Sequence, residues 1–467
     1  MSSFLRPTPA PSGAAWADAA TLGRAGWLHH TGWPLGTIGA GVLRQWVYIP
    51  RLAQRENALL FAPPGQGKSS RIIKPLLRSE TLHPPEHRAS LIVVDPVGEL
   101  LHDLGPAFGR THRVMVWSPT GRSSCGFDPL RYLPAPDDDN FGAACTMLAE
   151  VWMAATETPG GGGRSDPYWV QQPLNLLAGL IGVVGARDGA RASLLDVAAI
   201  LRTSNAEEIT GLLSSSPIEQ IRLRGAIAAD LMDNEKARSG VFSDLRARFI
   251  LLGDPRVKRA LQGPAFAAAD LVSAPTALFL QIEVQDRPYH PFLSAFVAML
   301  VDQLPRLSRD GRPLGREIRL IADEIGNMGR IYGLPEGLGT LRKYGVGQFL
   351  SVQSTPQLVA TYNEVGATKI IDNCVTEIAL GGVSDGDGRR TSERVGRRRT
   401  YREVPSYASG GLFGRTTHSY QHADDPLRRP DELRIMGYKA VITTAKIPPV
   451  LVDLHLDRER GTTWGSF

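Results

Sequence analysis

The segment A-P-P-G-Q-G-K-S, residues 62–69, has the residue types of a loop that holds a phosphate group. It fits the P-loop pattern with alanine at the first glycine position, and apolar residues flank it as a strand and a helix would. In such a loop, backbone N–H groups contact the β-phosphate, the lysine reaches the β- and γ-phosphates, and the serine hydroxyl coordinates Mg²⁺. A plain turn that ends in a surface lysine is the alternative. We expect ATP binding by Pro64, Gly65, Gln66, Gly67, Lys68, Ser69 and Ser70.

Two adjacent acids follow a second apolar run, I-R-L-I-A-D-E, residues 318–324. Asp323 ends the expected strand and, with Ser69, would hold Mg²⁺. Glu324 would orient and deprotonate the attacking water. Adjacent acids on the solvated edge of a strand are the alternative. Together with the loop, the pair predicts Mg²⁺-dependent hydrolysis of ATP in which Lys68 and Glu324 are catalytic.

Gln353 and Arg342 are the remaining catalytic candidates. Gln353 closes the apolar run G-Q-F-L-S-V-Q, so it would lie beside Asp323 and sense the γ-phosphate, unless it is an ordinary strand-end amide. Arg342 precedes Gly345 in the last turn of an expected helix, where a cation also favours the helix dipole. As an arginine finger it would instead reach a neighbouring subunit's γ-phosphate, which requires a ring of subunits. The residues alone leave both alternatives open.

Short apolar runs recur along the chain and predict the fold class. Most are continuous and not alternating, as in strands that are buried on both faces, and the stretches between them have helical periodicity. The sequence therefore predicts an α/β fold with a mostly parallel central sheet. The expected strands are residues 58–62, 91–95, 114–117, 277–282, 319–323, 348–353, 377–381 and 440–444.

Between residues 140 and 268 we find no strand pattern, and apolar positions recur at helical spacing, most clearly over 218–252. The glycine run at 160–163 is expected to be a loop. Because strand patterns resume afterwards, an all-helical domain is expected to interrupt the α/β domain. The predicted organisation is an N-terminal segment that contacts a partner or membrane surface (1–50), a motor domain (51–139 and 269–456), the helical insertion (140–268) and a tail (457–467).

Charge allows nucleic-acid binding without requiring it, because 52 Lys and Arg against 47 Asp and Glu give a net charge of +5. Seven arginines fall within residues 389–402, where Glu393 is the only acid. Such a run is commonly a solvated face, but it would also grip DNA phosphates without reading sequence. Tyr401 and Tyr407 would add stacking on bases. The candidates for DNA contact are Arg394, Arg397, Arg398 and Arg399.

The three cysteines are widely separated and form no C-x-x-C pair, which favours a reducing compartment over a disulfide framework or zinc site. No secretory signal is visible, and neither the uncharged stretch 31–43 nor the apolar stretch 174–186 qualifies as a transmembrane helix. Trp27, Trp33 and Trp46 would pack on the main domain or, alternatively, lie at a headgroup layer. We expect a cytoplasmic protein without a transmembrane segment, peripheral to the inner face of the membrane if attached.

The motifs and their order along the chain resemble those of the type IV secretion coupling proteins, the TraG/TraD group of conjugation ATPases with a RecA-like P-loop motor. The resemblance covers roughly residues 57–449 and implies that Arg342 is an arginine finger and Gln353 a γ-phosphate sensor. Besides the loop and the acid pair, the matching segments are VVDPVGELLHDLG (93–105), FDPLRYL (127–133), SDPYWVQQPLNLL (165–177), LGDPRVKRAL (252–261), LRKYGVGQFLSVQSTPQL (341–358), NCVTEIALGG (373–382) and RRPDELRIMG (428–437).

The chain also departs from the family pattern. Val97 stands where the family has a lysine in its Asp-x-Lys-Gly-Glu segment, so any role of that lysine is absent. The transmembrane helices that usually precede the motor are not seen in this sequence. The chain would therefore dock through another protein, lie peripherally at the membrane, or have been separated from its anchor.

The leading hypothesis is a hexameric, ATP- and Mg²⁺-dependent motor whose hydrolysis is stimulated by DNA. It would take single-stranded DNA from a relaxase-type nucleoprotein complex to the proteins of a type IV secretion channel. One alternative is a DNA-pumping or processing ATPase outside secretion. Another is a nucleotide-dependent platform that recruits secreted proteins through its helical domain.

Overall fold

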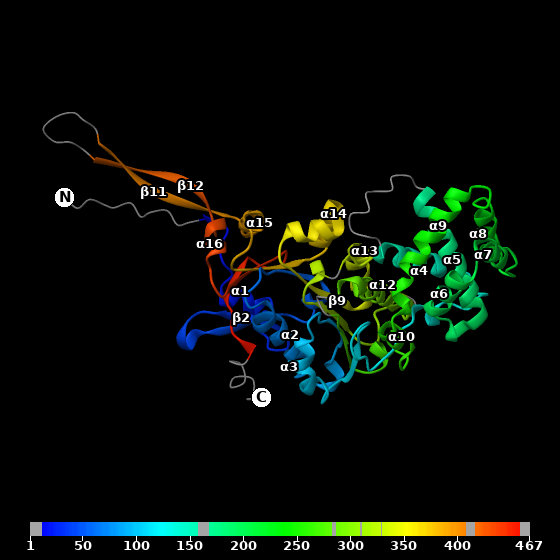
Figure 1. The fold of residues 1–467 in the computed structure, drawn as a ribbon. Coiled ribbons are helices and arrows are strands. Elements are labelled where there is room, and N and C mark those ends of the chain that lie inside the picture. Colours follow the sequence, from blue (N-terminus) through cyan, green and yellow to red (C-terminus); the bar gives the residue numbers. More distant parts are fainter. Residues whose placement is uncertain are drawn as a thin grey trace. The chain divides into compact units, whose positions relative to one another are not determined.

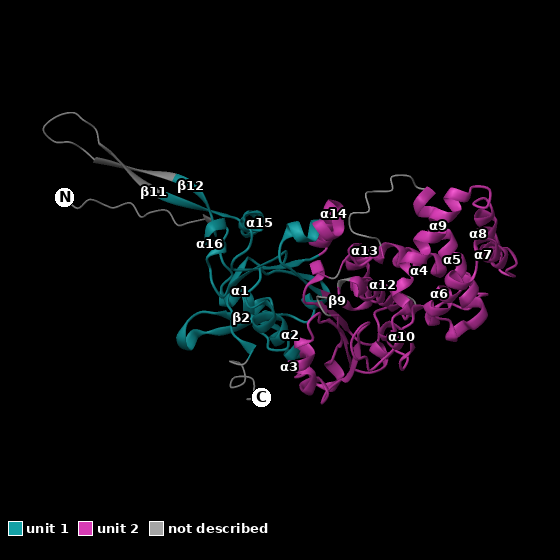
Figure 2. Cartoon of the chain, viewed as in Figure 1, with its two compact units in different colours: residues 1–79, 349–359, 374–467 teal, residues 80–348, 360–373 magenta. Residues whose placement is uncertain are grey.

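The computed structural model describes residues 12–156, 168–282, 286–308, 311–327, 329–407 and 416–457. The chain forms two compact units (Figure 2). Unit 1 comprises residues 1–79, 349–359 and 374–467, and unit 2 comprises residues 80–348 and 360–373. Each unit therefore combines stretches that are far apart in the sequence, and one strand, β9, contributes residues to both.

The sheet in unit 1 is parallel at one side and antiparallel at the other. Strand β4 pairs in parallel with both β9 and β10, so Leu59 lies opposite Leu350 and Glu377. Beyond β10 the order continues with β13, β14, β2 and β3, each antiparallel to its neighbour. The bounds are β2 (Trp33–Ile38), β3 (Gln45–Ile49), β4 (Ala58–Phe61), β9 (Val346–Val352), β10 (Thr376–Leu380), β13 (Lys439–Thr444) and β14 (Val450–Asp453).

The sheet in unit 2 is wholly parallel, with the order β8-β5-β7-β6. Every residue of β5, β7 and β8 is buried, which is why these strands read as continuous apolar runs. Aromatic side chains form part of the core, where Phe296 contacts Trp117 and Phe127 at ring distances of 4.5 and 4.0 Å. The bounds are β5 (Ser90–Val94), β6 (Arg113–Trp117), β7 (Thr276–Leu280) and β8 (Ile318–Ala322).

All eight expected strands are present, as β4 to β10 and β13, and the predicted α/β class with a mostly parallel sheet is confirmed. The helices outside the region between β6 and β7 are α1 (Ala19–Arg24), α2 (Lys74–Glu80), α3 (Glu99–Phe108), α12 (His290–Arg306), α13 (Leu334–Thr340), α14 (Thr355–Asp372), α15 (Asp385–Val395) and α16 (Pro430–Arg434). A small second sheet in unit 1 contains β1 (Ser12–Gly13), β11 (Arg397–Tyr407) and β12 (Thr416–Pro426).

The described residues between β6 and β7 form helices and no strand. Helix α5 contacts α4, α8 and α9 (Figure 1). The glycine run at 160–163 lies outside the described residues. The bounds are α4 (Phe141–Ala155), α5 (Tyr168–Asp188), α6 (Leu194–Thr203), α7 (Ala206–Ser214), α8 (Glu219–Ala229), α9 (Glu235–Arg248), α10 (Pro255–Gln262) and α11 (Asp270–Ser273).

Two of the apolar residues within the stretch 218–252 that showed helical spacing are exposed: Leu223 (59%) and Ile227 (37%). The buried residues of α8 are Ile221 and two small residues, Gly225 and Ala228. Gly225 packs so closely on α7 that a Cβ atom would lie 2.6 Å from the backbone nitrogen of Ser214. Close helix packing therefore decides which side of α8 is buried.

Helix α5 is longer than the apolar stretch seen in the sequence. Together with the turn that follows, residues 168–191 are long and apolar enough to cross a membrane, but 61% of the apolar window is buried in the protein. Such burial is the property of a core helix. Length and composition alone therefore give weak evidence for a membrane span.

The N-terminal tryptophans favour the packing interpretation. Trp27 and Trp33 are buried, and Trp33 meets Phe349 edge to face at 5.8 Å. Trp46 lies on β3 against the ring of His455, 5.2 Å away. Residues 33–49, placed by the sequence in a separate N-terminal segment, thus form two strands of the main sheet in unit 1.

Candidate nucleotide site

The glycine-rich loop begins where β4 ends. The backbone N–H of Ala62 donates to the carbonyl of Val352 on β9, at 2.9 Å, and so continues the ladder by one residue. Gly65 and Gly67 have φ angles of 78° and 80°, which L-residues with side chains rarely adopt. After Gly67 the chain turns helical, first as a wide turn (Lys68–Ile73) and then as α2.

The tip of the loop is exposed to solvent, whereas the helix that follows it packs into the core. Pro64 and Gly65 are exposed, Lys68 and Ser69 are half-buried, and Ile72 is buried in the core. The first turn of a helix offers N–H groups and a positive dipole end to an anion. The sequence-predicted strand, loop and helix are therefore all present, in the arrangement that a phosphate cradle needs.

Gln353 follows β9 and lies at the same edge of the sheet as the loop, because Val352 pairs with Phe61. Its backbone N–H donates to the side chain of Gln357 at 3.0 Å. Two residues on, the N–H of Thr355 donates to Asp387 at 3.1 Å, and the Thr355 hydroxyl donates to the same carboxylate. Ser384 also donates to it at 2.8 Å. Asp387, which is only 2% exposed, thus ties the turn that carries Gln353 to α15.

Helix α15 is also bound to the sheet through a buried carboxylate. Glu377 on β10 is 4% exposed and pairs with Arg390 at 2.8 Å and with Arg394 at 3.0 Å. The Arg390 guanidinium lies 4.3 Å above the ring of Phe61, the last residue of β4. Arg394, one of the expected DNA contacts, therefore has a structural partner inside unit 1.

The predicted acid pair lies at the carboxyl edge of the sheet in unit 2. Asp323 follows β8, and its N–H donates to Val94 at 3.3 Å; Glu324 is 6% exposed. Asp95, which follows the neighbouring strand β5, accepts from the N–H of Leu101 at 2.9 Å. Burial raises the pKa of Asp95, and the charge of Asp323 raises it further, while the hydrogen bonds lower it.

Asp95 is thus a third carboxylate at this edge, and the sequence reasoning gave it no role. The signal was available, because Asp95 follows an apolar strand just as Asp323 does. Val97, at the position of the family's lysine, is 74% exposed.

Arg342 lies in a short turn, η10 (Leu341–Tyr344), that follows α13 and ends at Gly345 with φ of 85°. The expected helix end and glycine cap are therefore confirmed, and the Arg342 side chain is exposed. Lys68 and Gln353 belong to unit 1, whereas Asp323, Glu324 and Arg342 belong to unit 2. The union of these two groups in one catalytic site stays a prediction.

The arginine run divides between α15 and a long hairpin, β11/β12. Arg397, Arg398 and Arg399 are exposed on β11. Acids stand opposite them on β12: Arg398 pairs in register with Asp425, and Arg399 approaches Asp424 at 3.5 Å. The ring of Tyr401 meets His422 at 5.6 Å, and the side chain of Tyr407 lies outside the described part.

The chain is similar to proteins of conjugative DNA transfer. A family model described as "Type IV secretory system Conjugative DNA transfer" matches residues 15–453. Conjugal transfer protein TraG of Rhizobium radiobacter is 23% identical over 372 residues, which cover 78% of this chain and 57% of that protein. TraG of Escherichia coli is 24% identical over 414 residues, covering 82% and 62%. The chain thus spans about three fifths of the length of these relatives.

Solved structures give the same fold. The plasmid coupling protein TrwB in complex with the non-hydrolysable ATP analogue ADPNP has a TM-score of 0.70 and 17% identity, covering 97% of this chain and 96% of that one. TrwB in complex with ADP and Mg²⁺ has a TM-score of 0.69 at the same identity and coverage. At this identity the likeness establishes a RecA-like P-loop NTPase fold.

We expect Asp387→Ala to destabilise the protein by about 1–3 kcal/mol, because it removes a buried acceptor and leaves the half-buried donors of Thr355 and Ser384 without their partner. Asp385→Ala is the matched control, since Asp385 on the same helix is 72% exposed and pairs with exposed Arg434. Its effect should stay within about 0.5 kcal/mol. Urea titration followed by circular dichroism gives both values, and equal losses for the two variants would contradict the anchoring role of Asp387.

Proposed function

Because the chain belongs to the type IV secretory system conjugative DNA transfer family, we propose that it is an ATP-driven DNA translocase that feeds a nucleoprotein substrate to a type IV secretion channel. One observation carries the proposal. The glycine-rich loop stands at the end of β4, directly beside β9, the strand that Gln353 follows, as a nucleotide-hydrolysing motor requires. TrwB structures with ADPNP and with ADP and Mg²⁺ support the choice of ligand.

The loop residues would hold the phosphates of ATP. Backbone N–H groups of residues 64–70 cradle them, and Lys68 supplies a positive charge to the β- and γ-phosphates. The site also offers oxygen ligands for Mg²⁺, an ion that prefers oxygen and usually keeps water and substrate phosphates in its coordination shell. Ser69 and Asp323 would hold it through hydroxyl and carboxylate oxygens. Bound Mg²⁺ neutralises charge that develops on the phosphates.

The remaining side chains would act on the attacking water and the γ-phosphate. Glu324 accepts a proton from that water and orients it. Gln353 donates a hydrogen bond to the γ-phosphate, and its place is fixed by the contact of Thr355 with Asp387. Arg342 acts as an arginine finger toward the nucleotide of an adjacent subunit, which its exposure on η10 permits.

The polymer would be single-stranded DNA that arrives with a relaxase-type protein and passes through a ring of six subunits. Arg397, Arg398 and Arg399 on β11 are the proposed phosphate contacts, because they are exposed, whereas Arg394 is held by Glu377. The protein would work at the inner face of the membrane, beside the channel. DNA-stimulated hydrolysis separates this function from recruitment of proteins alone.

We also propose the division of the chain into a motor (51–139 and 269–456), a helical insertion (140–268), an N-terminal segment (1–50), whose residues 33–49 add two strands to the sheet in unit 1, and a tail (457–467). The seven helices α4 to α10 support the insertion. The two compact units have different boundaries from these proposed domains. The strands of the proposed motor fall partly in unit 1 and partly in unit 2. Separate expression of residues 140–268 would test whether the insertion folds alone.

Lys68→Ala should lower ATP hydrolysis by about 100-fold or more, since a charged contact to the phosphates is lost, while folding is retained. The measurement is the ATPase rate without nucleic acid, with single-stranded DNA and with duplex DNA, alongside the mass of the protein in solution. Lys369→Ala, at a surface ion pair with Glu336, is the control and should keep the normal rate. A normal rate for Lys68→Ala would show that the loop is not the hydrolytic site.

Arg342→Ala and Glu324→Gln should each retain nucleotide binding and lose turnover, by about 10³-fold for the arginine. Mixing the two variants should restore activity, because roughly a quarter of the interfaces then pair an intact Glu324 with an intact Arg342. ATPase assays across mixing ratios measure the recovery. If no ratio recovers activity, Arg342 does not act across a subunit interface.

Changing Arg397, Arg398 and Arg399 together to Ala should weaken binding of single-stranded DNA and reduce the slope of log K against log salt by about 2. Asp424→Asn should have the opposite effect, because it removes the acid that faces Arg399. Fluorescence anisotropy with a labelled oligonucleotide at several salt concentrations measures both. Unchanged affinity in both variants would leave the hairpin as a solvated surface.

A further inference from the structure

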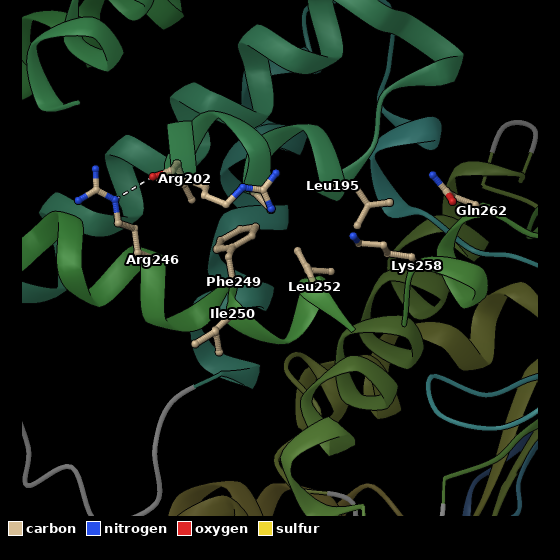
Figure 3. Close-up of a pocket in the computed structure, with 11 residues that line it drawn as sticks. Leu195, Arg202, Arg246, Phe249, Ile250, Leu252, Lys258 and Gln262 are labelled. Atoms are coloured by element: carbon tan, nitrogen blue, oxygen red, sulfur yellow. Dashed lines mark hydrogen bonds between the residues drawn. The ribbon is translucent and has the colours of Figure 1, made fainter. Parts of the chain in front are cut away.

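Unit 2 contains a pocket of about 640 Å³ that no part of the proposed motor uses. It lies among α6, α9, α10 and the turn η7 (Ile250–Gly253), far along the chain from the glycine-rich loop (Figure 3). A volume of this size is typical of sites that take a ligand. Its walls are apolar: Leu201, Phe249 and Leu252 are buried there, and Ile250 at its margin is 74% exposed.

Positively charged side chains lie beside these apolar walls. Arg202 on α6 and Lys258 on α10 are exposed and extend toward the space over Phe249 and Leu252 (Figure 3). Neither makes an ion pair within the described part of the chain. Arg246 is already engaged, because its Nε donates to the Leu201 carbonyl at 2.8 Å and closes the end of α6.

No acid neutralises these charges from inside the pocket, since none of its described lining residues is acidic. The acid nearest in sequence to Lys258 is Asp254, and it is bound by Arg256 at 2.8 Å and by the Tyr289 hydroxyl at 2.6 Å. The hydrogen bonds from these two partners hold the pKa of Asp254 well below its usual range, so this carboxylate stays committed to them.

From this combination we propose that the pocket binds a segment of a partner protein in which large apolar side chains are flanked by acidic residues. Burial of the apolar side chains against Phe249 and Leu252 supplies affinity, and carboxylates meet Arg202 and Lys258. The two cations come from different helices, so the occupant needs at least two separated negative charges. A peptide provides these at intervals along its chain, whereas a fatty acid has one carboxylate.

The site goes beyond ATP-driven transport and is independent of it. Its residues belong to the helices between β6 and β7 and include none of the nucleotide-site residues. A chain that cannot hydrolyse ATP would still bind the segment, and a chain that cannot bind the segment would still hydrolyse ATP. The two proposals therefore fail separately.

The test uses three fluorescein-labelled peptides and fluorescence polarisation with the full chain. The probe GSDELFEDGS carries both features, GSKKLFKKGS reverses the charge, and GSDESSEDGS lacks the apolar pair. We expect the first to bind and the other two to bind about tenfold more weakly or worse. Equal binding of the charge-reversed peptide, or no binding of the first at its highest soluble concentration, overturns the proposal.

Variants of the pocket complete the test. Arg202→Glu combined with Lys258→Glu should weaken binding of GSDELFEDGS about tenfold or more, and Ala198→Trp should do the same by filling the space. Arg259→Glu is the matched control, because Arg259 is exposed on α10 outside the pocket, and it should leave the affinity unchanged. Thermal melting and basal ATPase rate check that each variant is intact. Binding that survives both pocket changes, or displacement by laurate with no peptide dependence on charge, overturns the proposal.

Discussion

A buried negative charge organises unit 1. Glu377 lies in the middle of the sheet, and taking its carboxylate out of water is costly unless cations compensate it. Both cations come from α15, as Arg390 and Arg394, so the helix cannot leave the sheet without exposing or stranding the charge. Removal of one partner in such a cluster typically costs about 3–5 kcal/mol. The place of α15 on the sheet is therefore strongly determined.

Three elements of the proposed function depend on that helix. Arg390 covers Phe61, where the glycine-rich loop begins, and Asp387 holds the turn after Gln353. At its far end α15 leads through Gly396 into β11, which carries the exposed arginines. The loop, the glutamine and the hairpin are thus joined to one rigid element by short-range contacts. Two arginines of the run that the sequence offers for DNA contact, Arg390 and Arg394, therefore already have Glu377 as their partner.

The strands that sequence patterns predicted are the ones with no solvated face. Residues 90–94 are all buried and all but the first are apolar, so the run is legible without knowledge of its neighbours. The strands that were missed follow other rules. Residues 397–399 are three consecutive arginines at the start of β11, and residues 33–38 contain proline and glycine, so neither strand carries the apolar signal.

The sequence names the residues of the candidate site, but it does not reveal the long-range contacts that hold them in place. Lys68, Ser69 and the acid pair stand in motifs whose chemistry fixes their spacing. The carboxylate that positions the turn after Gln353 comes from Asp387, on another helix, and no local pattern links the two. Nor does periodicity reveal that Leu223 faces outward, because close packing at Gly225 decides it. Long-range contacts of this kind are set by the folded chain alone.

The composition of unit 1 from three separate stretches has a consequence during synthesis. Ala58 on β4 pairs with Phe349 on β9, about 290 residues later, and with Thr376 on β10. At the usual speed of translation, β4 would wait roughly 15–60 s after emerging from the ribosome before either partner exists. A fully apolar strand that stays unpaired for so long is exposed to wrong pairing, so the order of synthesis makes residues 58–61 a vulnerable part of the nascent chain.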